Sequence, residues 1–333
     1  MILAGDIGGT KANIALYTSR KDDLKLVQNH QFVSQNYDDF TDLIEEFITL
    51  YDVQDSDIEA ICFGIAGPII NGVCHTTNLP WIIETKKLQK KYKTNKVKLL
   101  NDLEATAYGM LFLDEDEFVQ INPNAQKVEA TRAVIAAGTG LGEAILFYDG
   151  KNYHPMSSEG GHCDFAPLNA LQDELLVWMR KRHRTHVSVE RLVSGIGIST
   201  IYQFLKEQNF AKESLSLQNL NEDTDKNAMI THYALEKKDP LCVETMRVFV
   251  EIYAAEAGNL ALKSLSLGGV YIGGGIAPKI LPFLQDGTFL NTFINKGRFK
   301  NTLKNMQIKI ALNQNTALLG AAYFGKKVLN KIT

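Results

Sequence analysis

The sequence predicts an α/β fold built as two lobes, and three observations support this. First, 333 residues suffice for two cores, because one domain usually takes roughly 100 to 200 residues. Second, short apolar runs alternate with amphipathic helical segments, which favours an α/β layer over a helix bundle. Third, a strand, glycine turn and strand near the amino end recur at residues 131–150. We expect a small lobe from residues 1–103 plus about 316–333, and a large lobe from 104–315.

The first lobe opens with a predicted β-hairpin, because ILAGD, IGGT and KANIALYT read as strand, turn and alternating strand. Residues 37–51 place apolar side chains at helical spacing, which predicts one buried face and one acidic face. A buried strand, IEAICFGIAGPI, comes next, and a Lys-rich helix is expected near 85–93. The strand KVKLL then leads into NDLEATAYGML, whose composition favours a helix.

The second lobe begins with the same pattern in TRAVIAAGTGLGEAILFYDG, residues 131–150, so the two hairpins indicate a weak internal duplication. Helices dominate from about 168 to 266. The segment GGVYIGGGIAP predicts a short buried strand, a glycine turn and a helix with Pro278 near its first turn. The strand MQIKIAL and the apolar helix TALLGAAYFGKKVL complete the chain, and we expect this last helix to return to the first lobe.

The composition is that of a globular enzyme and argues against nucleic acid and membranes as partners. The chain is 45% hydrophobic and 22% charged, with a net charge of -3, so neither nucleic acid nor an anionic membrane is an expected partner. It has no run of about 18 apolar residues that could span a bilayer. Its four cysteines, Cys62, Cys74, Cys163 and Cys242, are widely spaced without a CxxC pair. We therefore expect a reduced, cytoplasmic protein.

The glycine turns do not fit the usual nucleotide fingerprints. In GDIGGTK, Thr10 precedes Lys11 and a strand follows, whereas a P-loop ends in GK[ST] and opens a helix. GTGLG is also followed by a strand, unlike a dinucleotide-binding turn. The backbone N–H groups of the two hairpin turns suit phosphates, and a third glycine turn, Gly273 to Gly275, precedes a helix start. Each turn alone stays ambiguous, because tight hairpins need glycine with or without a ligand.

Taken together and in order, the motifs resemble a known family. The two hairpins and the strand–glycine–helix unit resemble the ATP-binding core of the actin, Hsp70 and sugar kinase superfamily. The other segments make the chain similar to bacterial glucokinases of the hexokinase-like type: TTNLPW (76–81), LLNDLEATAYG (99–109), EGGHCDFAP (159–167), VSVERLVSG (187–195) and KGRF (296–299). ROK sugar kinases differ, since they carry a CxCGxxGC cluster that this chain lacks.

This resemblance implies a two-lobed actin-like ATPase (ribonuclease H-like) fold, each lobe a mixed sheet flanked by helices, with a cleft between the lobes. It also implies ATP-dependent phosphorylation of glucose at the 6-hydroxyl to glucose 6-phosphate, Mg²⁺ as the metal and a homodimer. Asp102 matches the general base. The implied glucose ligands are Asn101, Asp102, Glu159, His162 and Glu190. The implied nucleotide-binding positions are Gly5, Asp6, Ile7, Gly8, Gly9, Thr10, Gly138, Thr139, Gly140, Gly274 and Gly275. No direct metal ligand is expected, and Asp6 would contact Mg²⁺ through water.

From the residue patterns alone, purely structural roles are also open for several of these side chains. Asp102 equally suits the cap of the following helix, and Glu190 suits the first turn of a helix capped by Ser188. Asp6 before a tight turn also fits an Asx-turn. His162 also fits a structural histidine, and Glu159 a solvated turn residue. A kinase for fructose, mannose or an N-acetylated sugar, or a non-catalytic sugar sensor on the same fold, remains an alternative function.

The stretch SSEGGHCDFAP, residues 157–167, concentrates Glu159, His162, Cys163 and Asp164 within six positions. Alternation along an extended segment would separate these side chains, so we do not expect them to bind one metal. We expect Cys163 to be a small buried residue and leave the role of Asp164 open. Trp81 is expected to pack in a core.

Overall fold

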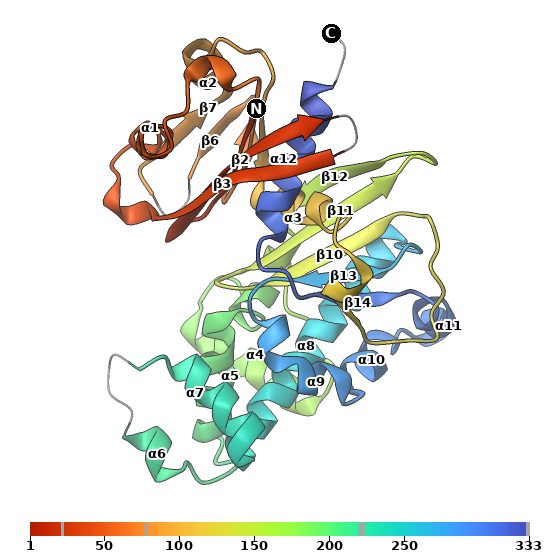
Figure 1. Ribbon diagram of the computed structural model, residues 1–333. Coiled ribbons are helices and arrows are strands. Elements are labelled where there is room, and N and C mark those ends of the chain that lie inside the picture. Colours follow the sequence, from red (N-terminus) through yellow and green to blue (C-terminus); the bar gives the residue numbers. More distant parts are fainter. Residues whose placement is uncertain (21–22, 77–78, 220–223, 331–333) are drawn as a thin grey trace. The chain divides into compact units, whose positions relative to one another are not determined.

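A computed structural model describes residues 1–20, 23–76, 79–219 and 224–330 (Figure 1). The chain folds into two compact units. The first comprises Met1–Glu117, Tyr153–Ser157 and Asn313–Thr333, and the second comprises Phe118–Asn152 and Ser158–Leu312. The first long segment of the small unit thus ends at Glu117 instead of near residue 103. Two residues of the TTNLPW motif, Thr77 and Asn78, lie outside the described ranges.

The first unit contains a five-stranded sheet in the order β3-β2-β1-β4-β8. β1 pairs antiparallel with β2 and parallel with β4, and β4 pairs parallel with β8, so the predicted amino-terminal hairpin is confirmed. A small antiparallel sheet, β5-β6-β7, follows β4. The strands are β1 (Ile2–Ile7), β2 (Lys11–Arg20), β3 (Asp23–Val33), β4 (Ala60–Ile65), β5 (Ile69–Ile70), β6 (Val73–His75), β7 (Ile82–Glu84) and β8 (Val97–Asn101).

The helices of the first unit include the amphipathic helix predicted within residues 37–51. Helix α1 (Phe40–Leu50) is capped by Asp39, whose carboxylate accepts a hydrogen bond of 2.7 Å from the Thr41 N–H, and it buries the predicted stripe. Trp81 is buried, as expected, and its indole N–H donates to the Tyr37 carbonyl at 2.9 Å. The other helices are α2 (Thr85–Tyr92), α3 (Asp102–Gly109) and α12 (Thr316–Leu329).

Helices α3 and α12 approach each other closely because glycines lie where they touch. A Cβ atom on Gly109 would stand 2.0 Å from the Thr316 carbonyl oxygen, and one on Gly320 would stand 1.8 Å from that of Ala105. No side chain fits at either position. The last helix therefore belongs to the first unit, as the sequence predicts, and α3 stays in this unit with it.

The second unit has a sheet in the order β12-β11-β10-β13-β14-β9. β10 pairs antiparallel with β11 and parallel with β13, which pairs parallel with β14. This order repeats that of the first sheet, so the duplication expected from the two hairpins is confirmed at the level of topology. The strands are β9 (Phe118–Gln120), β10 (Arg132–Ala137), β11 (Leu141–Tyr148), β12 (Tyr153–Ser158), β13 (Val270–Gly273) and β14 (Ile308–Ala311).

The core of the second unit is built around the long helix α8 (Pro240–Ser264; Figure 1). Its buried residues run along nearly its whole length. Asp239 caps it by accepting from the N–H groups of Leu241 and Cys242, both at 3.0 Å. The segment after Gly275 forms only a short 3₁₀ turn (Ala277–Ile280) and then α9, so the helix predicted there is interrupted. The other helices are α4 (Ala170–Arg182), α5 (Gly195–Glu207), α6 (Leu215–Gln218), α7 (Lys226–His232), α9 (Leu281–Gln285), α10 (Thr288–Phe293) and α11 (Lys300–Lys304).

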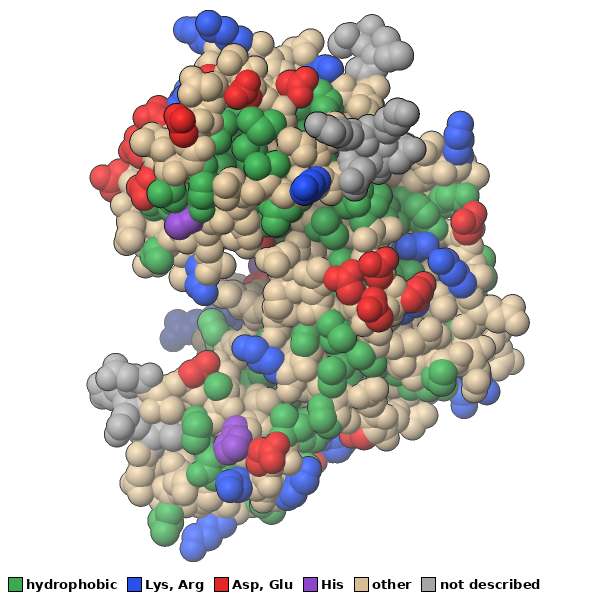
Figure 2. All heavy atoms as spheres, viewed as in Figure 1, with side chains coloured by type: hydrophobic (Ala, Val, Ile, Leu, Met, Phe, Trp, Pro, Cys, Tyr) green, Lys and Arg blue, Asp and Glu red, His purple; other side chains and the backbone are tan. Residues whose placement is uncertain are grey.

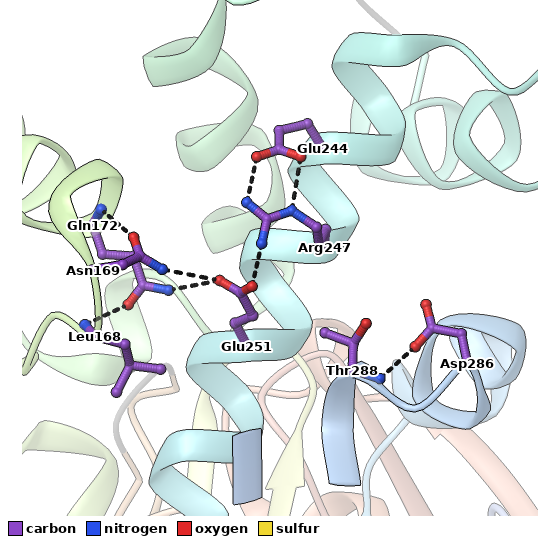
Figure 3. A network of polar contacts seen from close by, with 8 residues as sticks. All are labelled: Leu168, Asn169, Gln172, Glu244, Arg247, Glu251, Asp286 and Thr288. Carbon is purple, nitrogen blue, oxygen red and sulfur yellow. Dashed lines mark hydrogen bonds and ion pairs between the residues drawn. The ribbon is translucent and has the colours of Figure 1, made fainter. Parts of the chain in front are cut away.

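A polar network ties the start of α4 to α8 (Figure 3). Arg247 bonds Glu244 through Nε at 2.8 Å and through a second nitrogen at 2.5 Å, and it also bonds Glu251. Glu251 in turn accepts from the buried Gln172 amide at 3.1 Å. Because Gln172 also accepts from the Leu168 N–H at 3.0 Å, the network fixes the chain directly after the segment 157–167.

The distribution of charged side chains on the surface agrees with the nearly balanced charge of the sequence. Figure 2 shows basic and acidic side chains interspersed with apolar and neutral ones, and no single sign of charge covers the face in view. Among the residues that the structure describes, no helix combines the length and apolar character needed to cross a membrane.

Candidate active site

In the first unit, candidate residues gather at the carboxyl ends of parallel strands. Asp6 lies near the end of β1, and Asn101 and Asp102 lie where β8 passes into α3. Neighbouring strands are tied at the same edge, because the Asn101 amide donates to the Gly67 carbonyl at 3.2 Å. Ligands in open α/β sheets bind at this kind of edge.

Asn101, and not Asp102, is the amino-terminal cap of α3. Its side-chain oxygen accepts from the Leu103 N–H at 2.9 Å, and Glu104 accepts from the Asn101 N–H at 2.9 Å, which completes a capping box. Asp102 is the first helical residue, and one of its carboxylate oxygens also accepts from the Leu103 N–H at 2.9 Å. The capping box thus holds the backbone on both sides of Asp102, whose carboxylate lies at a helix amino terminus, where negative charge is favoured.

Asp6 is shifted toward its protonated form by its surroundings. Burial raises its pKa from 3.8 to about 6, and the Asp102 carboxylate adds to the shift. A nearby cation would stabilise the ionised forms of these two carboxyl groups at the sheet edge, because a positive charge offsets their mutual repulsion.

The first glycine turn is held by its own backbone and by Ser34. The Gly8 N–H donates to the Lys11 carbonyl at 2.9 Å, and the Ser34 hydroxyl donates to the Gly8 carbonyl at 2.8 Å. Gly5 and Ile7 are strand residues: a Cβ on Gly5 would stand 2.8 Å from Phe63, and the Ile7 side chain is buried in the core. Gly8, Gly9 and Thr10 form the turn itself.

In the second unit, the glycine turn Gly138–Gly140 contacts the amino terminus of α5, and a second glycine turn packs against the end of β10. The Gly138 N–H donates to the Gly140 carbonyl, and the Gly195 N–H donates to the Gly138 carbonyl, both at 2.9 Å. Gly274, which has φ +83°, packs against the end of β10, where a Cβ would stand 2.3 Å from the Ala137 carbonyl oxygen. Gly275 follows it in the same turn, and Thr139 is exposed at the tip of its hairpin. The positions predicted to bind phosphate and adenosine in this unit are therefore neighbours.

The candidate sugar ligands of this unit are joined to the same turn through Glu190. Its Oε2 atom accepts from the Leu141 N–H at 3.0 Å, and a Cβ on Gly140 would stand 2.5 Å from that oxygen. Glu190 lies in a 3₁₀ turn (Val189–Arg191), and the Ser188 side chain makes no capping bond there. Its carboxylate is thus committed to the turn between β10 and β11 instead of to its own helix start.

His162 lies between two carboxylates. Its Nδ1 atom is 3.8 Å from Oε1 of Glu190, and its Nε2 atom is 3.9 Å from Oε2 of Glu159. Both separations exceed a hydrogen bond, so the imidazole is near both carboxylates without being hydrogen-bonded to either. The loop reaches this position through Gly161, where a Cβ would stand 2.1 Å from the Leu141 carbonyl oxygen.

Glu143, a buried acid beneath this loop, was not singled out by the sequence patterns. It lies on β11 and is 1% exposed, and its Oε1 atom has no hydrogen-bond partner in the described part of the chain. Burial raises its pKa from 4.5 to about 7, Glu256 adds to the shift and Lys263 opposes it. A Cβ on Gly160 would stand 1.9 Å from its Oε2 atom. The available signal was strand alternation, which places Glu143 on the same face as Leu141.

The expectation that Cys163 is buried is wrong, since its side chain is exposed. Residues 160–162 form a 3₁₀ turn, so the alternation of an extended strand does not apply until the chain reaches the buried Phe165. Across the described ranges, no group of three or more His, Cys, Asp or Glu side chains is placed to hold a metal ion.

Two sheets of the same strand order, each with a glycine hairpin, define an actin-like ATPase fold of the sugar kinase class. A profile of the Glucokinase family matches residues 3–328. A glucokinase from Nostoc punctiforme is 40% identical over 97% of this chain and 98% of its own. The crystal structure of a glucokinase from an Antarctic psychrotroph superimposes with a TM-score of 0.83 at 30% identity, covering 98% of each chain. The chain belongs to the Glucokinase family.

A structure with lower sequence identity supports the assignment of the fold only. The glucokinase of Balamuthia mandrillaris, solved in complex with glucose, superimposes with a TM-score of 0.79 at 23% identity over 98% of this chain and 93% of that chain. The similarity across such different sequences agrees with a fold set by strand order and glycine turns.

Proposed function

We propose that this protein transfers the γ-phosphoryl group of ATP to the 6-hydroxyl of glucose. One observation supports this most strongly: in the second unit a single carboxylate, Glu190, binds the backbone directly after the glycine turn Gly138–Gly140 and also faces His162. A side chain suited to sugar hydroxyls and a turn suited to phosphates are thereby fixed in one piece of structure.

Asp102 is proposed as the general base. Phosphoryl transfer needs the attacking hydroxyl held in line and relieved of its proton, with little covalent work by the protein. A carboxylate at the junction of β8 and α3, held on both sides by the capping box of Asn101 and Glu104, offers a rigidly placed acceptor for that proton. General-base catalysis contributes about 10² to 10⁴ in rate.

The sugar is proposed to be held by Asn101, Glu159, His162 and Glu190. Carboxylates accept from two adjacent hydroxyls, whereas an amide or imidazole both donates and accepts. The long separations around His162 suit this role, because the side chains are grouped without satisfying one another.

Mg²⁺ is proposed to act with ATP, and the acids of the first unit fit it. The raised pKa of Asp6 beside Asp102 marks a place where added positive charge is favourable, and Asp6 would hold the ion through water. When bound, the ion neutralises charge on the transferring phosphates. Asp6→Asn should therefore raise the KM for Mg·ATP more than that for glucose.

A coupled ADP assay across hexoses tests the proposed function. Purified protein with Mg·ATP should release ADP in the presence of glucose and much less with fructose, mannose or N-acetylglucosamine. A higher kcat/KM for another sugar would overturn the assignment of glucose. The absence of any sugar-dependent ADP release would refute the kinase activity itself.

The role of Asp102 has its own test. Asp102→Asn should lower kcat by about 10² to 10⁴ while the dissociation constant for glucose changes only a few-fold. Asp55→Asn, at an exposed position of the same unit, is the matched control. A kcat within twofold of wild type for Asp102→Asn would remove it as the base.

The homodimer expected from the family resemblance and the cytoplasmic location expected from the composition also belong to this proposal. Light scattering coupled to size-exclusion chromatography should give about twice the chain mass of 37.1 kDa. A mass of one chain at micromolar concentration would contradict the dimer. Fractionation of cells should recover the protein with soluble enzymes, and recovery with membranes would contradict the location.

A further inference from the structure

We propose that His186 is a positioning residue that, together with Asp164, holds the loop carrying His162 in its sugar-binding conformation. This inference rests on the proposed function, because it assumes that His162 binds the sugar. It also gives Asp164, for which the sequence offered no role, a place in the site.

The imidazole of His186 bridges two parts of one loop. Its Nε2 atom donates to the main-chain carbonyl of His162 at 2.8 Å, and its Nδ1 atom lies 3.0 Å from Oδ1 of Asp164. Both ring nitrogens thus face oxygen acceptors. Because a carbonyl oxygen can only accept, Nε2 carries the hydrogen of its bond to His162.

The bridge lies beside a short stretch of antiparallel main-chain pairing. The Phe165 N–H donates to the Val187 carbonyl at 2.9 Å, and the Val189 N–H donates to the Cys163 carbonyl at 3.0 Å, with Asp164 and Ser188 directly opposite each other. This pairing joins the segment after His162 to the segment before Glu190. His186 directly precedes the paired residues 187–189, and its side chain reaches past Asp164 to the carbonyl of His162.

The location of this contact determines its consequence. The candidate sugar ligands Glu159 and His162 flank the two glycines of this loop, a residue type whose backbone has many accessible conformations once its contacts are lost. The His162 carbonyl is held through His186, while Glu190 is held separately by the Leu141 N–H. Loss of His186 should therefore loosen the loop that carries Glu159 and His162 and leave Glu190 in place.

The expected effect is modest and specific to the sugar. Asp164 is 91% exposed and His186 is 45% exposed, so their ion pair alone contributes little. Loss of one hydrogen bond to the loop corresponds to about a 2- to 12-fold weakening. His186→Ala should raise the KM and dissociation constant for glucose by that factor, with kcat and the KM for ATP changed by less than about twofold.

A set of variants separates positioning from general damage. His186→Gln keeps a donor near the place of Nε2 and should recover most of the glucose affinity that His186→Ala loses. Asp164→Asn should have a smaller effect, and in the His186→Ala background it should add nothing, because Asp164 acts through the ring. His232→Ala, at an exposed position of α7, is the control for loss of a histidine.

Hydrogen exchange without sugar gives a readout independent of catalysis. Amides of residues 159–165 should exchange faster in His186→Ala than in wild type, while those of α5 should not change. Unchanged exchange, or an unchanged KM for glucose in His186→Ala, would overturn the inference. The inference would also be overturned if His186→Ala lowered kcat or raised the KM for ATP by as much as it raised the KM for glucose. If the wild-type protein phosphorylates no sugar, the proposed function fails, and the exchange result still decides whether His186 holds the loop.

Discussion

Glu143→Gln should make the protein more resistant to alkaline pH. The carboxyl of Glu143 is 1% exposed beneath the glycine loop, and its pKa is raised from 4.5 to about 7 by burial and by Glu256. The folded state therefore keeps a proton that the unfolded chain releases above pH 4.5. Stability falls as pH rises between these two values and levels off above the higher one.

The magnitude follows from the two pKa values. Each pKa unit is worth 1.36 kcal/mol, so the interval from 4.5 to about 7 corresponds to about 3 kcal/mol of lost stability at pH 8. Glutamine has nearly the same shape and no charge to desolvate. Relative to wild type, Glu143→Gln should thus gain up to about 3 kcal/mol between pH 4 and pH 8, or about 4 °C in Tm if the whole chain unfolds together.

Differential scanning fluorimetry at a series of pH values measures this directly. Every other titrating group is common to both proteins, so the difference in Tm between variant and wild type isolates Glu143. Glu174→Gln, at an exposed position of α4, should show a difference independent of pH. A Tm difference for Glu143→Gln that stays constant within about 1 °C would refute the argument from burial.

Three further substitutions test other parts of the structure. Gly140→Ala places a Cβ 2.5 Å from the Glu190 carboxylate and, by displacing it, should raise the KM for glucose about tenfold; an unchanged KM would contradict that contact. Arg247→Met removes the cation shared by Glu244 and Glu251 and should lower stability by about 1 to 2 kcal/mol in thermal unfolding, whereas the exposed Arg180→Met should be nearly neutral. Asn101→Ala removes the cap of α3 and should cost about 1 kcal/mol in the same assay, so a wild-type Tm would argue against the capping box.

Much of the fold could be predicted because its signals are local. Alternating and apolar runs predicted both hairpins, and helical spacing predicted the buried stripe of α1. The alternation argument failed at Cys163, because a 3₁₀ turn of residues 160–162 changes which side chains face outward. The sequence left open whether Asp102 caps α3, because Asn101 and Asp102 are equally good capping types; the structure makes Asn101 the cap and Asp102 the first helical residue.

The succession of strands and helices along the chain, the glycine turns and the family resemblance all follow from the sequence alone, because they depend on residues close together along the chain. Which distant groups come into contact depends on how the chain folds in three dimensions. Glu190 binds the N–H of Leu141, 49 residues away, His186 reaches the carbonyl of His162, and Glu143 is buried near Glu256. Local patterns cannot specify such contacts, because a side chain's charge, partner and exposure depend on the segments that fold against it.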